Sequence, residues 1–275
     1  MTGPGVSILM PVFNGGEYLL DAVEGALVQL REDDELLLQD GGSTDGSLDV
    51  LREKFGHYPQ LKIVSRKDDG QADALNLALA RAQNPIIGWL NADDRINPGA
   101  VDAVRRAWVA HPDADIVYGS WQIFGNDGAI LRDCVPKEFT LESLTWQPHV
   151  FTGAIYYDRN LLREHGAFDV DMHYCMDLDL VLRLATIPPR CVQVPEVLGS
   201  FRWHDDSKTG QMNFGIVKEA YVVRRRYARG LRGHLYADLC SLVHLVAWLA
   251  LPLRQARWYS RLRTKAAQRR AAGAV

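Results

Sequence analysis

A short segment rich in acidic and amide side chains, NADD, follows the apolar run IIGWL. In an extended backbone Asn91 and Asp93 project to the same side as a pair of oxygen ligands, whereas Asp94 points elsewhere unless the chain turns at once. Such a pair leaves several coordination positions open, which suits Mg²⁺ or Mn²⁺ held partly by substrate phosphates. The alternative is a polar turn whose side chains bond the backbone before the next helix. Spacing alone favours neither interpretation.

A second polar segment, QDGGSTDGS, follows the apolar residues 36–38. A turn needs fewer such residues, so we predict that this loop holds a ligand. The Asp40 carboxylate could accept hydrogen bonds from a nucleotide base or a ribose hydroxyl, and Asp45 is interpreted as the cap of a helix that begins near Gly46. The glycines form neither a Walker A loop nor a GxGxxG pattern, so a P-loop or dinucleotide fold has no support.

Apolar runs alternate with helical periodicities over the first 120 residues. Strands are predicted at 6–10, 36–38, 61–64, 86–90 and 115–119, and helices at 15–30, 48–55, 70–82 and 100–111. This alternation predicts an open, mostly parallel α/β sheet with right-handed crossovers. Ligands of such sheets bind beyond the carboxyl ends of the strands. Four polar loops occupy these positions and are expected to converge on one edge: VFNGG, QDGGSTDG, RKDDGQ and NADD.

The pattern changes after residue 120. We predict a hairpin over 123–131 with an Asn-Asp-Gly turn, strands at 152–157, 191–194 and 198–203, and helices at 159–165 and 177–185. In the last helix Asp179 and Arg183 are spaced i, i+4, which is typical of a surface ion pair. No linker-like segment divides these elements from the first half, so one domain is expected over 1–214, followed by a helical appendage over 215–275.

The ordered combination of VSILMPVFNGGEYLLDAV, QDGGSTDGS, DDGQADALNLAL and IIGWLNADD resembles the successive motifs of family 2 glycosyltransferases. The resemblance covers about residues 5–210. It implies the GT-A fold, a Rossmann-like open sheet with helices on both faces, with a nucleotide-sugar-binding half at 1–120 and an acceptor and catalytic-base half at 121–214. The residues implied to bind the donor are Pro11, Phe13, Asn14, Asp40, Gly70, Gln71, Asn91, Asp93 and Asp94. The family's Asp-x-Asp signature reads Asn91-Ala92-Asp93 here, so an amide replaces its first carboxylate.

The resemblance also implies a catalytic base in an acidic pair that opens a helix of the second half. FDVDMHYCMDLDLVLRLA matches this region, with Met176-Asp177 where Glu-Asp is usual. From the residues alone, Asp177 could equally be a helix cap or an acid favoured by the helix dipole. The implied reaction is an inverting, single-displacement transfer from a UDP- or dTDP-linked sugar to a hydroxyl of a glycan or lipid-linked acceptor. Asp177 would take the hydroxyl proton, assisted by Mg²⁺ or Mn²⁺ at the diphosphate.

A late segment, FRWHDDSKTG, resembles a loop of many bacterial members, in which His204 and Lys208 could approach the diphosphate. His204 and Asp93 are therefore the candidate metal ligands, and Lys208 is a loop candidate. For the acceptor, the candidates are His149 and Met176, with Trp146 as a possible sugar-stacking residue. Purely structural roles for these side chains, and an exposed loop at 201–210, remain open.

The charge of the chain is divided unevenly. Residues 216–275 carry 13 Lys and Arg against two acids, whereas the rest of the chain carries 18 basic and 32 acidic residues. An acidic body does not suit nucleic acid, and the tail lacks a base-stacking platform, so no nucleic-acid partner is expected. The apolar stretch 239–253 is short for a span of roughly 20 residues, so a helix lying on an anionic membrane surface is predicted. Packing on the enzyme or a homodimer interface are the alternatives.

The four cysteines lie far apart and no signal peptide is evident, which favours reduced thiols in the cytoplasm, on the inner face of the membrane. Two other functions are weighed. A sugar nucleotidyltransferase would need a basic residue in the loop VFNGGEY, and a non-catalytic, membrane-attached nucleotide-sugar-binding protein is favoured only by Asn91. The sequence does not identify the donor base, the sugar, the acceptor or the oligomeric state.

Overall fold

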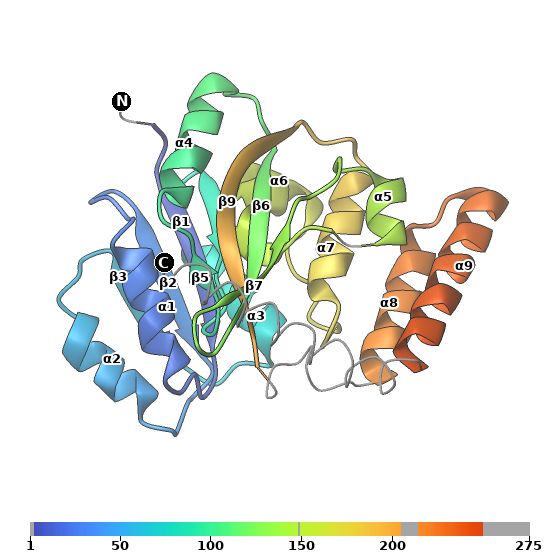
Figure 1. Cartoon of the computed structure of the whole chain (residues 1–275). Helices are drawn as coiled ribbons and strands as arrows, with labels where there is room; N and C mark the ends of the chain where they lie inside the picture. Colours follow the sequence, from blue (N-terminus) through green and yellow to red (C-terminus); the bar gives the residue numbers. More distant parts are fainter. Residues whose placement is uncertain (1–2, 148, 205–213, 250–275) are drawn as a thin grey trace, which may run out of the picture.

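The computed structural model describes residues 3–147, 149–204 and 214–249, in which one sheet carries helices on both faces (Figure 1). The strands lie in the order β3-β2-β1-β4-β8-β6-β9-β5, and β7 pairs with β6. The strands are β1 Val6–Val12, β2 Glu35–Asp40, β3 Leu61–Ser65, β4 Ile86–Trp89, β5 Arg95–Ile96, β6 Ile116–Gly125, β7 Ile130–Cys134, β8 Ile155–Asp158 and β9 Cys191–Trp203.

The helices occupy the intervals that the periodicity predicts, with two additions. They are α1 Tyr18–Leu27, α2 Ser47–Phe55, α3 Gln71–Arg81, α4 Ala100–Ala110, α5 Leu141–Trp146, α6 Arg159–His165, α7 Met176–Ala185, α8 Phe214–Tyr227 and α9 Gly230–Leu249, with a 3₁₀ turn, η1, at Thr152–Ala154. The helix α5 and the turn η1 were not predicted. A capping box between Thr140 and Ser143 starts α5, but serine at its third position is a weaker signal than the usual Glu or Gln.

The first four strands along the sheet, β3, β2, β1 and β4, are mutually parallel, so their carboxyl ends share one edge. Strand β8 runs antiparallel to both β4 and β6, and β9 runs parallel to β6. The predicted fold class, a mostly parallel GT-A-like sheet with a helical C-terminal region, is therefore confirmed. Pro11 has no N–H to donate to a neighbouring strand. It is tolerated in β1 because the pairing of β1 with β4 ends at Leu9, before Pro11 is reached.

Two apolar cores form on opposite faces of the sheet. Alternate residues of β1 point to opposite faces, so that Ile8 and Met10 join α1, α2 and α4, whereas Leu9 joins α3, α6 and α7. Each face thus has its own layer of helices, and the loops at the carboxyl edge are held between two packed cores.

The strand β9 differs from the two separate strands that we predicted at 191–194 and 198–203. It is one strand whose pairing with β6 shifts register around Pro195, because proline has no N–H to donate to a ladder. The two-residue strand β5 was also missed, since it exists only through its pairing with β9 at Arg95–Ser200 and Ile96–Gly199. The hairpin turn near Gly128 is as predicted.

The helices α8 and α9 form the helical C-terminal region, on the side of α7 that faces away from the sheet (Figure 1). Val223 of α8 is fully buried in the same core as α7, so α8 is packed into the body of the protein. The division of the chain at residue 214 stays a prediction. Among the described helices, none has the length and apolar character needed to cross a membrane.

Candidate active site

The loops after β1 and β2 are bound to each other. The Asn14 N–H donates to Ser43 Oγ at 2.7 Å, and the Thr44 N–H donates to Asn14 Oδ1 at 3.0 Å. The Gly16 N–H donates to Asp45 Oδ2 at 2.9 Å. Asn14 has a φ of 49°, in the left-handed region that Asn tolerates better than most residues. The two polar segments therefore form one continuous wall at the carboxyl edge.

Asp40 lies inside this wall, fully buried. Its carboxylate accepts hydrogen bonds from the Gly42 N–H at 3.1 Å, the Ser43 hydroxyl and the Ser65 hydroxyl at 2.6 Å. These hydrogen bonds stabilise the conformation of the loop. A direct contact between Asp40 and a donor nucleotide stays a prediction. The glycine and serine composition that drew attention to the segment is explained by these tight internal bonds.

Asp45 holds the start of α2, as the sequence indicated. Its Oδ1 accepts from the Ser47 N–H at 3.1 Å and the Ser47 hydroxyl at 2.6 Å. The Ser47 hydroxyl, together with the Gly16 and Ser47 amides, lowers the pKa of the Asp45 carboxyl below its ordinary value. Asp45 therefore joins the first loop to the second helix while remaining charged.

The other donor-binding candidates occupy different environments along the same edge. Phe13 is 68% exposed, beside the buried Pro11. Gly70 has a φ of 110°, which glycine alone adopts readily, and it lets the chain enter α3 directly at Gln71. The Gln71 side chain then reaches Asn91, donating to its Oδ1 at 3.0 Å.

The segment after β4 turns at once, which changes the expected pairing. The Asp94 N–H donates to the Asn91 carbonyl at 3.2 Å, and Asn91 Nδ2 donates to Asp94 Oδ2 at 2.8 Å. Asn91 is thus paired with Asp94, and the extended-chain expectation that it pairs with Asp93 is wrong. Its Oδ1 also accepts from Trp89 Nε1 at 2.8 Å. The amide therefore links three neighbours by donating and accepting, which a carboxylate in its place could not do.

Asp94 is 1% exposed and accepts from the Arg202 N–H at 3.0 Å. Burial raises the pKa of its carboxyl well above the ordinary value, and the neighbouring Asp93 charge adds to the rise. Asp94 therefore holds β9 against the turn. A direct contact between Asp94 and the donor stays a prediction, as it does for the equally buried Asp40.

Asp93 and His204 meet at the carboxyl edge although 111 residues separate them. The His204 Nε2 lies 3.1 Å from Asp93 Oδ2, and the Asp93 side chain is 32% exposed. Arg202 Nε donates to the Asp93 carbonyl at 2.8 Å, and the Tyr18 ring packs 5.1 Å from the His204 ring, so both partners are held in place. A carboxylate and an imidazole in this position could serve as two ligands of a divalent cation. In the described residues no group of three or more His, Cys, Asp or Glu is gathered as a metal site.

Asp177 lies in the first turn of α7 and is exposed, whereas its neighbours Met176 and Leu178 are buried. Its Oδ1 accepts from the Leu178 N–H at 2.7 Å, so it also stabilises the start of its own helix. The segment before α7 contacts the donor half, because the Phe168 ring packs edge-on against Trp89 at 5.2 Å. Trp89 bonds Asn91, and this chain of contacts connects the Asp93 turn to the Asp177 helix.

Of two predictions about α7, one needs correction. Met176 is 4% exposed and packs in the core, and its contact with an acceptor stays a prediction. Asp179 is 1% exposed and does not form a surface ion pair with Arg183 alone. It also bonds Arg226 at 2.8 Å and the Tyr227 hydroxyl at 2.9 Å, because α8 covers this side of α7.

The acceptor candidates in the loop before η1 are held by protein contacts. His149 Nδ1 accepts from the Lys137 N–H at 3.1 Å, and its Nε2 lies 3.1 Å from Ser143 Oγ. Burial lowers the pKa of its imidazole, and the Lys137 charge lowers it further. Trp146 stacks on Tyr236 of α9. Both geometries indicate structural roles, and Lys208 lies outside the described residues.

The family of the chain follows from comparison with known proteins. The model described as Glycosyl transferase family 2 matches residues 7–165, which include the whole donor edge from β1 to the Asp93 turn. The chain belongs to this family. This family is one of glycosyltransferases, which favours that activity over a sugar nucleotidyltransferase.

Curated relatives of this family 2 glycosyltransferase are larger proteins. A chondroitin synthase of Escherichia coli is 37% identical over 248 residues, which cover 87% of this chain and 35% of that protein. A hyaluronan synthase of Pasteurella multocida is 29% identical over 185 residues, or 67% of this chain and 19% of that protein. The chain thus spans roughly a fifth to a third of the length of these relatives.

Solved structures share the fold of this glycosyltransferase at low identity. The mannosyltransferase PcManGT from Pyrobaculum calidifontis, in complex with GDP-Man and Mn²⁺, superposes with a TM-score of 0.65 at 21% identity, covering 99% of this chain and 80% of that one. S. aureus TarS 1-349 in complex with UDP-GlcNAc has a TM-score of 0.61 at 16% identity, covering 86% and 70%. Both support the GT-A fold of the family 2 chain.

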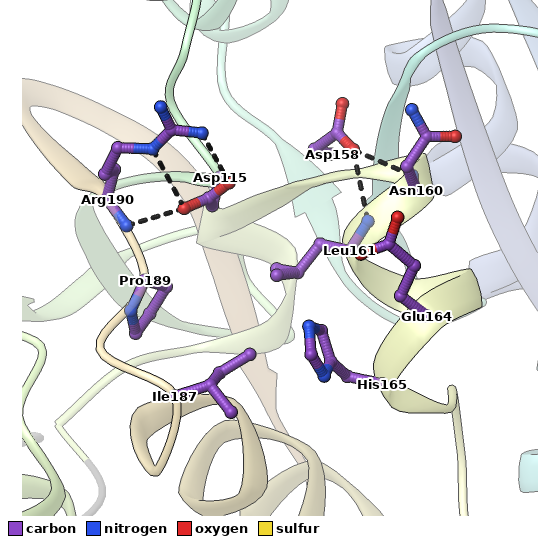
Figure 2. A pocket seen from close by; sticks show the side chains of 9 residues that line it. All are labelled: Asp115, Asp158, Asn160, Leu161, Glu164, His165, Ile187, Pro189 and Arg190. Atoms are coloured by element: carbon purple, nitrogen blue, oxygen red, sulfur yellow. Dashed lines mark hydrogen bonds and ion pairs between the residues drawn. The ribbon is translucent and has the colours of Figure 1, made fainter.

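A pocket that was not predicted lies on the opposite edge of the sheet, between the amino end of β6 and the start of α6 (Figure 2). Its volume is about 370 Å³. Two of its carboxylates are engaged in the fold: Asp115 bonds Arg190, and Asp158 caps α6 through the Asn160 N–H. The candidate active site of the glycosyltransferase remains at the carboxyl edge.

Proposed function

We propose that this family 2 glycosyltransferase transfers a sugar from a uridine or thymidine diphosphate sugar to a hydroxyl of a glycan or lipid-linked acceptor, with inversion at the anomeric carbon. The observation that carries the proposal is the 3.1 Å approach of His204 to Asp93 at the edge where four polar loops meet. These two residues are spaced too far apart in the sequence to meet by local structure. Their convergence supports a built site for a cation-bound diphosphate.

The roles divide between two groups of residues. Asp93 and His204 would hold Mg²⁺ or Mn²⁺, which when bound supplies positive charge to the departing diphosphate. The loops after β1 and β2, which include Asn14, line the donor side together with Gln71. The exposed Phe13 offers an apolar surface to the nucleotide base of the donor. The Asp177 carboxylate takes the proton of the attacking hydroxyl, the hydroxyl oxygen forms the new glycosidic bond, and the bond to the diphosphate breaks. One such displacement inverts the configuration.

The test of the base is the substitution Asp177→Asn. General-base catalysis typically contributes about 10²–10⁴-fold, so transfer should fall by that factor while donor affinity remains. Asp171→Asn, in the exposed loop before α7, removes a carboxylate of similar exposure and serves as the matched control. Equal transfer rates in Asp177→Asn and wild type would exclude Asp177 as the base.

The test of the donor site is a thermal-shift screen against nucleotide sugars with and without Mn²⁺. A UDP- or dTDP-sugar should raise Tm more in the presence of Mn²⁺, and Asp93→Asn should remove the metal-dependent part of the shift. A shift that is the same with and without Mn²⁺, or that is greatest for a purine nucleotide sugar, would contradict this part of the proposal.

We also propose that α9 lies on an anionic membrane surface. Its large apolar side chains are exposed along one face, at Leu231, Leu235, Leu239, Leu242, Val246 and Leu249, while the small residues Ala237 and Cys240 are buried. Arg229 and Arg232 are exposed at its start, and seven more Lys and Arg follow residue 249 without an acid. This charge favours anionic lipid over a second copy of the same basic region.

Co-sedimentation with vesicles tests this proposal. The protein should bind vesicles containing phosphatidylglycerol more than pure phosphatidylcholine vesicles, and Leu239→Glu should reduce the binding. Val28→Glu, at an exposed apolar position outside α9, is the control. Dimerisation that depends on Leu239 without lipid binding would favour a homodimer interface instead.

A further inference from the structure

A carboxylate of α8 is bound by the backbone immediately before the helix that carries Asp177. The N–H groups of His173, Tyr174 and Cys175 donate to the Glu219 carboxylate at 3.2, 2.8 and 3.0 Å. Three successive N–H groups directed at one anion form a nest, and bonds to an ionised acceptor are stronger than neutral ones. Glu219 thus fixes a loop that lies more than 40 residues earlier in the chain.

Among the described residues, the start of α7 lacks a side-chain cap from its N-cap residue, Cys175. The Asp177 carboxylate accepts from the Leu178 N–H, so the proposed base itself takes part in the first turn of α7. The placement of the first turn therefore depends on groups outside α7.

The other end of the same face of α8 contacts α7 as well. Arg226 and Tyr227 follow Glu219 by seven and eight positions, two turns of helix, and both bond the buried Asp179. The fully buried Val223 lies between them along the face. The helix α8 is thus joined to α7 and the loop before it at two points, on either side of Asp177 in the sequence.

We propose that Glu219 is a positioning residue for catalysis: through the backbone of residues 173–175 it sets the place of Asp177 relative to the donor edge. The inference rests on the proposed function, because it assumes that Asp177 is the base. It assigns a catalytic purpose to part of the basic C-terminal region, in addition to any binding of lipid. Glu219 itself touches neither donor nor acceptor in this proposal.

The experiment compares Glu219→Ala and Glu219→Gln with wild type in kcat, donor KM and Tm. A small displacement of a catalytic group can cost roughly 10²-fold, so Glu219→Ala should lower kcat by up to that factor with donor KM within about twofold. Glu219→Gln keeps the shape and one acceptor oxygen, so its loss should be smaller. Arg225→Gln is the matched control, because Arg225 pairs with Asp238 of α9 and not with α7.

A double-mutant cycle separates positioning from general stability. If Glu219 acts through Asp177, Glu219→Ala should have almost no further effect on transfer in an Asp177→Asn background. Full additivity of the two substitutions would overturn the inference. So would a kcat equal to wild type in both Glu219→Gln and Glu219→Ala. A parallel loss of kcat and donor affinity in Glu219→Ala would also overturn it. If Asp177→Asn alone leaves transfer intact, the proposed base fails, and this result is distinct from the failure of Glu219.

Discussion

Two buried aspartates, one in each half of the molecule, are held in different ways. Asp34 is fully buried in the donor half, where its carboxylate accepts from Arg105 at 2.7 Å and from the Val6 and Arg31 N–H groups at 2.8 Å. Asp179 is equally buried in the catalytic half but bonds Arg226, whose side chain is 40% exposed. The first network is closed to water, whereas the second opens to it on one side.

The networks also differ in where their partners come from. Asp34 and Arg105 both lie within the family-matched residues 7–165, but Asp179 and Arg226 both lie beyond them. The Asp34–Arg105 pair therefore lies within the shared part of the family, although Asp93 at the donor edge takes its partners His204 and Arg202 from beyond it. The Asp179 network is completed by α8, so the start of α7, which carries the proposed base Asp177, depends on a segment outside the family model.

The largest effect on stability is expected for Asp34→Ala. It leaves the Arg105 guanidinium, 2% exposed, without its buried ion partner and with only the half-exposed Asp102 carboxylate, 3.7 Å from Nε. Removing one member of a buried pair typically costs about 3–5 kcal/mol. Urea unfolding should show a loss of this size. Glu196→Ala, which removes an exposed partner of Arg106, should cost less than about 1 kcal/mol. Similar losses in the two variants would contradict the buried network.

A smaller loss, about 1–3 kcal/mol, is expected for Asn91→Asp, although it restores the usual family signature. The new carboxylate would replace the Nδ2 donor that lies 2.8 Å from the Asp94 carboxylate. Urea unfolding at pH 8 measures the effect, with the exposed turn substitution Asn126→Asp as the control. An Asn91→Asp protein as stable as wild type would show that this amide is not needed by the fold.

Asp179→Asn should cost about 1–2 kcal/mol, less than Asp34→Ala, because water can reach the partly exposed Arg226. If the comparison of the two halves is correct, this variant should lose kcat as well, while donor affinity is kept. Urea unfolding combined with initial-rate kinetics tests both parts. A loss equal to that of Asp34→Ala would remove the distinction between a closed and an open network.

The smallest effect is a pH dependence from Asp45, whose carboxyl pKa is lowered mainly by the Ser47 hydroxyl. A group with a lowered pKa in the folded state stabilises the fold above its ordinary value of 3.8, and this contribution is lost as the pH falls through the folded value. The Tm difference between wild type and Asp45→Asn should therefore shrink from pH 6 to pH 3. If this Tm difference does not change with pH, the hydrogen bonds of Asp45 stabilise the fold without a contribution from its charge.

Much of the donor half could be predicted because its signals are local. The alternation of apolar runs and helices locates β1–β4 and α1–α4, and parallel pairing then brings the loops that contain Asn14, Asp40 and Asp93 to one edge. The capping role of Asp45 was also predicted, because it depends only on the short distance in sequence between Asp45 and the start of α2 at Ser47. The pairing of Asn91 with Asp94 was missed because it depends on a turn that spacing does not reveal.

The catalytic half was harder to predict because its decisive contacts join distant segments. Asp179 and Arg183 fit a surface pair by spacing, and only the packing of α8 on α7 shows that Asp179 is buried. The spacing of Glu219, Val223 and Arg226 places them on one face of a helix, which can be predicted from the sequence. The spacing does not show which segment packs against that face.

The sequence by itself determined the order of the elements, the family motifs and the edge at which the polar loops gather, because backbone propensity and apolar periodicity act over a few residues. The tertiary structure decided which carboxylates are buried and which are exposed: Asp40, Asp94 and Asp179 are enclosed, whereas Asp93 and Asp177 reach the surface. The physical reason is that the exposure of a charge depends on every segment that packs around it, and those segments come from all along the chain.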